Sequence, residues 1–150
     1  MHAPRRALTG LAAAALALSL ALTAGCSAGA SEQQLQYETD YSNHPHLEVT
    51  GYPTTETLGV VQRVVWGMAD GTAERLADLA HPEGSDAAHR ATAADWIREY
   101  RKGAQGKVTA EFQDDPMERQ SVQLTFHDTG QATVLDLRPD IETGWRVVMK

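Results

Sequence analysis

The spacing of the apolar residues changes once along this chain, near Gly106, from the period of a helix to that of a strand. Before this point, apolar stripes recur every three or four residues in three segments: about 55–70, 73–80 and 93–102. After it, apolar and polar residues alternate in four segments: 108–113, 122–127, 132–135 and 145–149. The connections between the four expected strands are short, which makes neighbouring strands antiparallel. The sequence therefore predicts an α+β domain over 54–150, with helices on one face of a four-stranded sheet.

Residue types at the ends of the helical segments support these predictions. Thr54 or Thr55 can cap the first helix, and the Asp-Gly pair that follows can end it, because glycine adopts the left-handed conformation without steric cost. Thr92 and Asp95 resemble a capping box for the third helix, and Gly103 is expected to end that helix.

The first 25 residues are typical of a signal peptide. Arg5 and Arg6 precede an apolar run of Ala and Leu from Ala7 to Ala24. At about 18 residues, this run approaches the lower limit for a membrane-spanning helix, so a permanent anchor is one interpretation of it. Cys26, the only cysteine, argues against that interpretation because it directly follows small residues, where a signal peptidase needs room to bind.

The segment Leu22–Cys26, Leu-Thr-Ala-Gly-Cys, resembles the lipobox of bacterial lipoproteins. The resemblance implies cleavage after Gly25, a diacylglyceryl group on the Cys26 thiol and a lipid anchor on the extracytoplasmic face of the cell membrane. The alternative is a plain secretory signal with a chance cysteine, and the export route stays open between the general and the twin-arginine pathways. If Cys26 is acylated, the mature chain has no thiol for a disulfide, a nucleophile or a metal site.

The mature chain is acidic. Removal of 1–25 leaves 125 residues, a normal size for one domain. Arg5 and Arg6 are the only charged residues removed, so 11 Lys and Arg remain against 20 Asp and Glu, a net charge of −9. Such a charge disfavours nucleic acid as a partner and disfavours a domain that lies flat on an anionic membrane.

Residues 26–53 are mostly polar, and we expect them to form a flexible tether between the lipid and the domain. The stretch Leu47–Tyr52 alternates and can add a short strand, but the fold prediction does not depend on it.

Two histidines in the tether, His44 and His46, flank a proline and would point to the same side of an extended chain, as in some metal sites. Asp40 and Glu48 lie nearby. A tight site needs three or four convergent ligands on a supported backbone, so we favour a solvated linker without a metal.

Residues 54–76 combine an apolar helix, an Asp-Gly break and a second helix, and they resemble the opening of nuclear transport factor 2-like domains. The resemblance covers about 54–150. It implies a cone made of the helices and a strongly bent antiparallel sheet, a fold that is also described as cystatin-like. Small extracytoplasmic lipoproteins of actinobacterial type often carry such a domain. The same cone serves as enzyme, ligand binder or assembly module, so the fold does not assign a role.

An enzyme of this fold needs an acid or a base inside the cone, and Asp136 and His127 are the nearest candidates. Alternation places His127 opposite the apolar residues of its strand, so it is expected to face solvent. Asp136 lies on the same side as Val134 only if its strand is regular, and that arrangement could bring it inward. We favour a surface histidine and an ordinary aspartate over catalysis.

The sequence thus favours a lipid-anchored, non-enzymatic envelope protein that binds a protein partner or a small apolar ligand and uses no cofactor. The alternative is an isomerase, cyclase or hydratase acting in the cone, and a third hypothesis is metal capture by His44 and His46. Cys26 is the only residue whose expected functional role is supported by a sequence motif.

Overall fold

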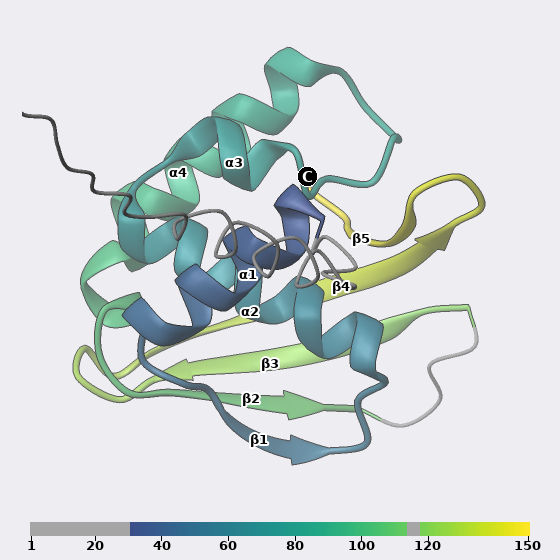
Figure 1. Cartoon of the computed structure of the whole chain (residues 1–150). Coiled ribbons are helices and arrows are strands. Elements are labelled where there is room, and N and C mark those ends of the chain that lie inside the picture. The colour runs from purple at the N-terminus through teal and green to yellow at the C-terminus, as the bar shows by residue number, and fades with distance from the viewer. Residues whose placement is uncertain (1–30, 114–117) are drawn as a thin grey trace, which may run out of the picture. The chain divides into compact units, whose positions relative to one another are not determined.

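A computed structural model describes residues 31–113 and 118–150 of the chain. In these ranges the chain forms four helices and five strands: α1 (Glu32–Asn43), β1 (Glu48–Gly51), α2 (Thr55–Asp70), α3 (Ala73–Ala77), α4 (Asp86–Ala104), β2 (Val108–Phe112), β3 (Gln120–Phe126), β4 (Gln131–Asp140) and β5 (Gly144–Val147). The helices lie on one side of the sheet, as Figure 1 shows. The predicted α+β class is therefore confirmed.

The sheet has five strands in the order β1-β2-β3-β4-β5, and β1 runs parallel to β2 while the other pairs are antiparallel. The prediction of a four-stranded antiparallel sheet was wrong in both respects. The extra strand is the short alternating stretch at Glu48–Gly51. It can pair in parallel because α2, α3 and α4 all lie between β1 and β2 in the chain, which supplies the long crossover that parallel strands need.

The alternation of the strands places one sheet face in the core. In β3, every second residue from Gln120 to Phe126 is buried, and Leu135 and Leu137 of β4 continue the same face. From the helices, α2 contributes most of the core, with a row of buried residues: Val60, Val61, Val64, Val65, Trp66 and Met68. Apolar side chains of the helices and of this sheet face thus pack together in one cluster.

The ends of α2 follow from its sequence. Thr54 Oγ1 accepts a hydrogen bond from the Thr57 amide at 3.1 Å, and Thr57 Oγ1 accepts one from the Thr54 amide at 3.0 Å. This reciprocal pair satisfies amides that have no partner within the helix. At the other end, Gly71 adopts the left-handed conformation with φ 76°. Both predicted ends of this helix are confirmed, with Thr54 as the cap.

Helix α3 is shorter than predicted because its C-terminal continuation pairs with β5. The Val147 amide donates to the Leu79 carbonyl at 3.0 Å, and the His81 amide donates to the Val147 carbonyl at 2.7 Å. The chain after Ala77 therefore runs along the edge of β5, where the predicted helix would have continued to Ala80.

Helix α4 starts seven residues earlier than expected, at Asp86, because Ser85 caps it by accepting a hydrogen bond from the Ala88 amide at 3.2 Å. The predicted capping box was wrong, since Thr92 lies inside the helix and its hydroxyl donates to the Lys150 carbonyl. The predicted end at Gly103 was also wrong, because the helix continues to Ala104.

The segment predicted to be a flexible tether contains α1 and β1 in the structure. Residues 36–150 form one compact unit, so most of α1 belongs to the domain. The leader 1–25 and Cys26 lie outside the described residues. Among the helices that the structure does describe, none has the length and apolar character needed to cross a membrane.

Candidate functional site

The two candidate catalytic residues lie away from the core. Asp136 occupies the strand position between the buried Leu135 and Leu137, so it projects from the other face of the sheet. Its carboxylate accepts a hydrogen bond from Ser121 Oγ at 3.1 Å and lies 3.7 Å from the Lys150 ammonium group. The inward Asp136 that catalysis in the cone would require is therefore not found, because the strand is regular and leucines occupy its core side.

His127 is exposed at the end of β3, as expected from alternation. Its Nε2 lies 2.7 Å from Thr109 Oγ1, and the same hydroxyl donates to Glu48 at 3.3 Å. These contacts join β1, β2 and the end of β3 on the face of the sheet that is opposite the core.

The predicted histidine pair does not converge on a common point. His44 uses both ring nitrogens, since Nδ1 lies 2.7 Å from the Asp40 carbonyl oxygen and Nε2 lies 2.7 Å from Asp70 Oδ1. His46 Nε2 instead lies 3.1 Å from the Tyr41 carbonyl oxygen. Over residues 31–113 and 118–150, no three His, Cys, Asp or Glu side chains are grouped so that they could hold a metal ion.

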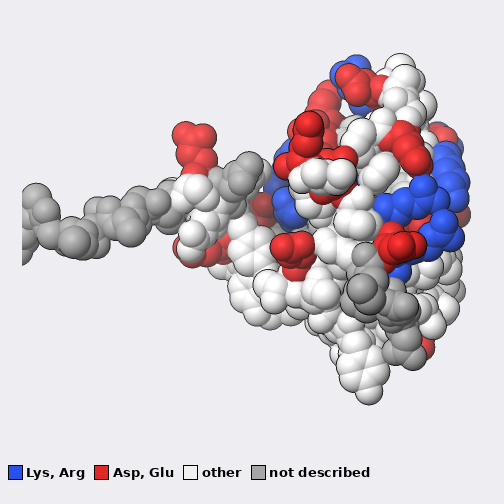
Figure 2. All heavy atoms as spheres, turned by 90° about the vertical axis from the view of Figure 1, so that its right-hand side faces the viewer, with Lys and Arg blue, Asp and Glu red and all other residues white. Residues whose placement is uncertain are grey.

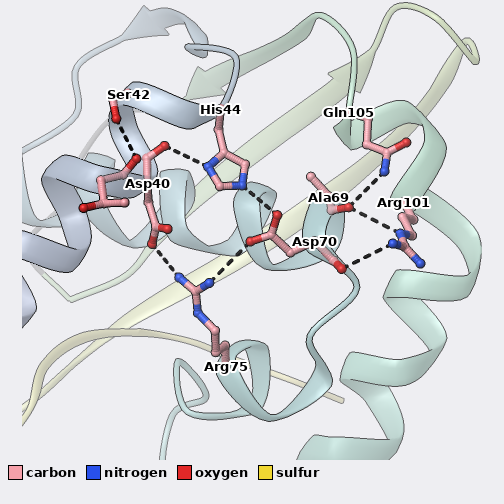
Figure 3. A network of polar contacts seen from close by, with 9 residues as sticks. Asp40, Ser42, His44, Ala69, Asp70, Arg75, Arg101 and Gln105 are labelled. Carbon is pink, nitrogen blue, oxygen red and sulfur yellow. Dashed lines mark hydrogen bonds and ion pairs between the residues drawn. The ribbon is translucent and has the colours of Figure 1, made fainter.

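The most connected polar site is the Asp70 junction, which we define as Asp40, His44, Asp70, Arg75 and Arg101 (Figure 3). Asp70 accepts from His44 through Oδ1 and from Arg75 through Oδ2, at 2.7 and 3.3 Å. Arg75 also forms a close ion pair with Asp40. The junction therefore joins α1 and the residue that follows it to the end of α2 and to α3.

Helix geometry explains why cations gather at this place. Asp70 is the last residue of α2, where the carbonyl groups have no partner within the helix and the helix dipole disfavours an acid. Arg101 donates to the carbonyl oxygens of Ala69 and Asp70, both at 3.3 Å, and Gln105 donates to that of Ala69 at 3.1 Å. Arg101 and Gln105 thus supply hydrogen-bond donors to carbonyl groups at the end of α2, while His44 and Arg75 neutralise the Asp70 carboxylate.

An aromatic cluster lies beside this junction and consists of Tyr37, Tyr41, His44, His46 and Trp66. The ring centroid of Trp66 lies 5.7 Å from that of Tyr37 and 5.4 Å from that of His44. Trp66 is only 1% exposed, and its Nε1 has no hydrogen-bond partner. The hydroxyl of Tyr37 donates to Gln62 Oε1 at 2.7 Å and thereby satisfies a buried amide oxygen. The described part of α1 beyond Leu35 thus packs on α2 through aromatic rings.

The charge of His44 depends on these contacts. Burial of the ring is the largest single influence and lowers its pKa, but the hydrogen bond and charge of Asp70, together with the Asp40 carbonyl and carboxylate, outweigh it. The pKa of His44 therefore lies above its ordinary value of 6.5.

Sequence reasoning treated His44 as a linker residue and Asp70 only as the end of a helix. The signal that could have located this site is the pair Tyr37 and Tyr41, because residues four apart on a helix share one face. Their partner Trp66 lies on another helix, so the pair alone does not identify the packing surface.

Charged residues on the side of the molecule seen in Figure 2 are mixed. Asp and Glu side chains are spread over this side, while Lys and Arg gather mainly along one edge. Several charged side chains of the domain occur as pairs, for example Arg138 with Glu83 at 3.0 Å.

Comparisons with models of protein families, with curated proteins and with solved structures found no match to this chain.

Proposed function

We propose that this protein is a lipoprotein, held on the extracytoplasmic face of the cell membrane by acyl chains on Cys26, whose domain acts as a binding module. The observation that carries the proposal is the segment Leu22–Cys26 at the end of an apolar run that follows two arginines. Several acyl chains make a stable anchor, since each buried methylene group contributes about 0.8 kcal/mol.

A non-enzymatic role for the domain is supported by the nature of its core. The core-facing side of the sheet and the facing side of α2 are lined by packed aliphatic and aromatic residues. Asp136 and His127, the only two bases that the sequence offered for catalysis, project from other surfaces. A partner would therefore meet the polar outer face of the sheet more readily than a small apolar ligand would enter the core, and we favour an envelope protein as the partner.

We also infer that the domain belongs to the cone-shaped, nuclear transport factor 2-like class. Support comes from the order of its parts after Thr54: a capped apolar helix, an Asp-Gly break, two further helices and an antiparallel run from β2 to β5. The parallel strand β1 is an addition to that plan.

Metabolic labelling with a fatty acid tests the anchor. We expect the wild-type chain to incorporate the label, to lose 1–25 and to sediment with membranes. Cys26→Ala should abolish both labelling and cleavage, since a lipoprotein peptidase requires the modified cysteine. Ser27→Ala, one residue away, is the matched control and should behave as the wild type. Equal labelling of Cys26→Ala and wild type would refute the proposal.

A further inference from the structure

We propose that α1 is a releasable strap, docked over Trp66 and fastened by a proton on His44, so that a rise in pH loosens its attachment to the rest of the domain. This inference concerns residues 36–44 and does not depend on the lipid anchor.

The hydrogen bonds of His44 favour its charged form. Nδ1 faces a backbone carbonyl oxygen of Asp40, and Nε2 faces a carboxylate oxygen of Asp70. Both groups only accept hydrogen bonds, whereas a neutral imidazole has a single N–H to donate. The cation therefore satisfies both contacts and the neutral ring satisfies only one. Deprotonation leaves one ring nitrogen 2.7 Å from an oxygen with no proton between them.

The position of His44 connects this proton to the docking of α1. Its side chain is 12% exposed and directly follows the end of α1, while Asp70 ends α2. Loss of the Nε2 contact removes an interaction between two segments that lie 26 residues apart in the chain. The His44 ring also stacks on Trp66 of α2, so the same side chain makes a second contact between the end of α1 and α2.

The charged groups around His44 make the release partial. From α1, Asp40 adds a negative charge, and from α2, Asp70 adds another. From α3, Arg75 contacts both carboxylates, so it continues to bridge α1 and α2 when the His44 contact is lost. From α4, Arg101 contacts only the Asp70 carbonyl within this junction. His44 is the only histidine of the junction, and the pH effect is assigned to it.

The structure also favours release of α1 over unfolding of the whole domain. Helix α1 has 12 residues, and isolated helices of that length are marginal in water. Tyr37 and Tyr41 remain 36% and 41% exposed although they contact Trp66, so α1 covers α2 from outside the main core. On release, the Trp66 indole N–H would gain a water partner that it lacks when covered. That gain offsets part of the cost of exposing the ring.

The sign of the pH effect follows from the raised pKa of His44. Docking is fully stabilised below 6.5, the ordinary pKa of histidine, and this stabilisation is lost as the pH rises through the higher pKa of the docked form. We therefore expect α1 to be fastened in mildly acidic solution and loosened in mildly alkaline solution.

Amide hydrogen exchange of the full purified chain tests the proposal between pH 5 and pH 8. Protection is expressed relative to the unstructured rate at each pH. We expect protection at 40–44 to fall by roughly threefold or more across this range, because the lost Nε2 contact is a hydrogen bond that joins α1 to α2. Protection in β3 should stay constant. A constant protection at 40–44, or an equal fall in β3, would overturn the proposal.

The variants His44→Gln and His46→Gln separate the two histidines. His44→Gln should remove the pH dependence at 40–44, and His46→Gln should keep it, because the hydrogen bond and the ring stack of His46 are both with Tyr41 of α1. An unchanged pH dependence in His44→Gln would refute the role of this residue. If His44→Gln does not fold, NMR titration of the wild type decides, because the amides at 40–44 must then titrate with the same midpoint as the His44 ring. Different midpoints would overturn the proposal.

Discussion

Replacement of Gly103 with alanine tests how closely α4 packs on the β3–β4 hairpin. An added Cβ at Gly103 would lie 2.7 Å from the Phe126 Cβ and 2.8 Å from Thr129 Oγ1. Carbon atoms in ordinary contact are about 3.5–4.0 Å apart, so helix and hairpin must separate by roughly 1 Å. Overpacking of this kind costs about 1–3 kcal/mol. The shift would also disturb the stacked rings of Tyr100 and Phe126, whose centroids are 5.2 Å apart.

Gly59→Ala in α2 is the matched control, because no atom of the neighbouring elements lies within 4 Å of its added Cβ. Both substitutions gain about 1 kcal/mol of helix propensity, and this gain cancels when the two variants are compared. The free energy of unfolding of Gly103→Ala should therefore lie about 1–3 kcal/mol below that of Gly59→Ala, as measured by urea denaturation followed by circular dichroism. Equal stabilisation of the two variants would refute the packing argument.

Three further changes probe other parts of the domain. Tyr37→Phe should lower the free energy of unfolding by about 1–2 kcal/mol in urea denaturation, because it leaves the buried Gln62 oxygen without its donor; an unchanged value would contradict this. Leu135→Ala should lower it by about 2–5 kcal/mol through a cavity in the core, and a loss below about 1 kcal/mol would place this side chain outside the core. Hydrogen bonds from Thr143 lower the pKa of Asp140 below its ordinary value of 3.8, so the stability that Asp140 contributes is present above that pH and lost as pH falls through the lowered pKa. NMR titration of Asp140 in Thr143→Val, which loses only the side-chain bond, should show a higher pKa than in the wild type, and equal values would exclude the Thr143 hydroxyl as a cause.

The apolar period predicted the helices and strands of 54–150 well, because each of them buries one face by itself. The end of α2 was predictable for a similar reason, since Gly71 acts locally. The start of α4 was missed because its first turns are rich in alanine, which gives almost no apolar stripe. Only the Ser85 hydroxyl marks that start, and serine occurs as often in loops.

Helix α1 could not be predicted from its own sequence because its packing surface is supplied by another element. Its residues are almost all polar, and Tyr37 and Tyr41 form a face only when Trp66 lies opposite. The Asp70 junction was missed for the same reason. Arg75 reaches Asp40 across 35 positions of the chain, and no local spacing indicates such a contact.

Taken together, the lipid anchor and the releasable α1 would let the proton on His44 change how far the domain can extend from its lipid. With α1 docked, ten residue steps separate Cys26 from Gln36, where the domain begins, and an extended chain of that length spans at most about 34 Å. Complete release of α1, in which the Arg75–Asp40 pair also breaks, would make Leu47 the first fixed residue, because it packs against the core, and twenty-one steps span at most about 71 Å. His44 lies between these two attachment points. The same contact that covers Trp66 therefore also limits how far the domain can move from its lipid, and loss of the proton would relax both limits at once.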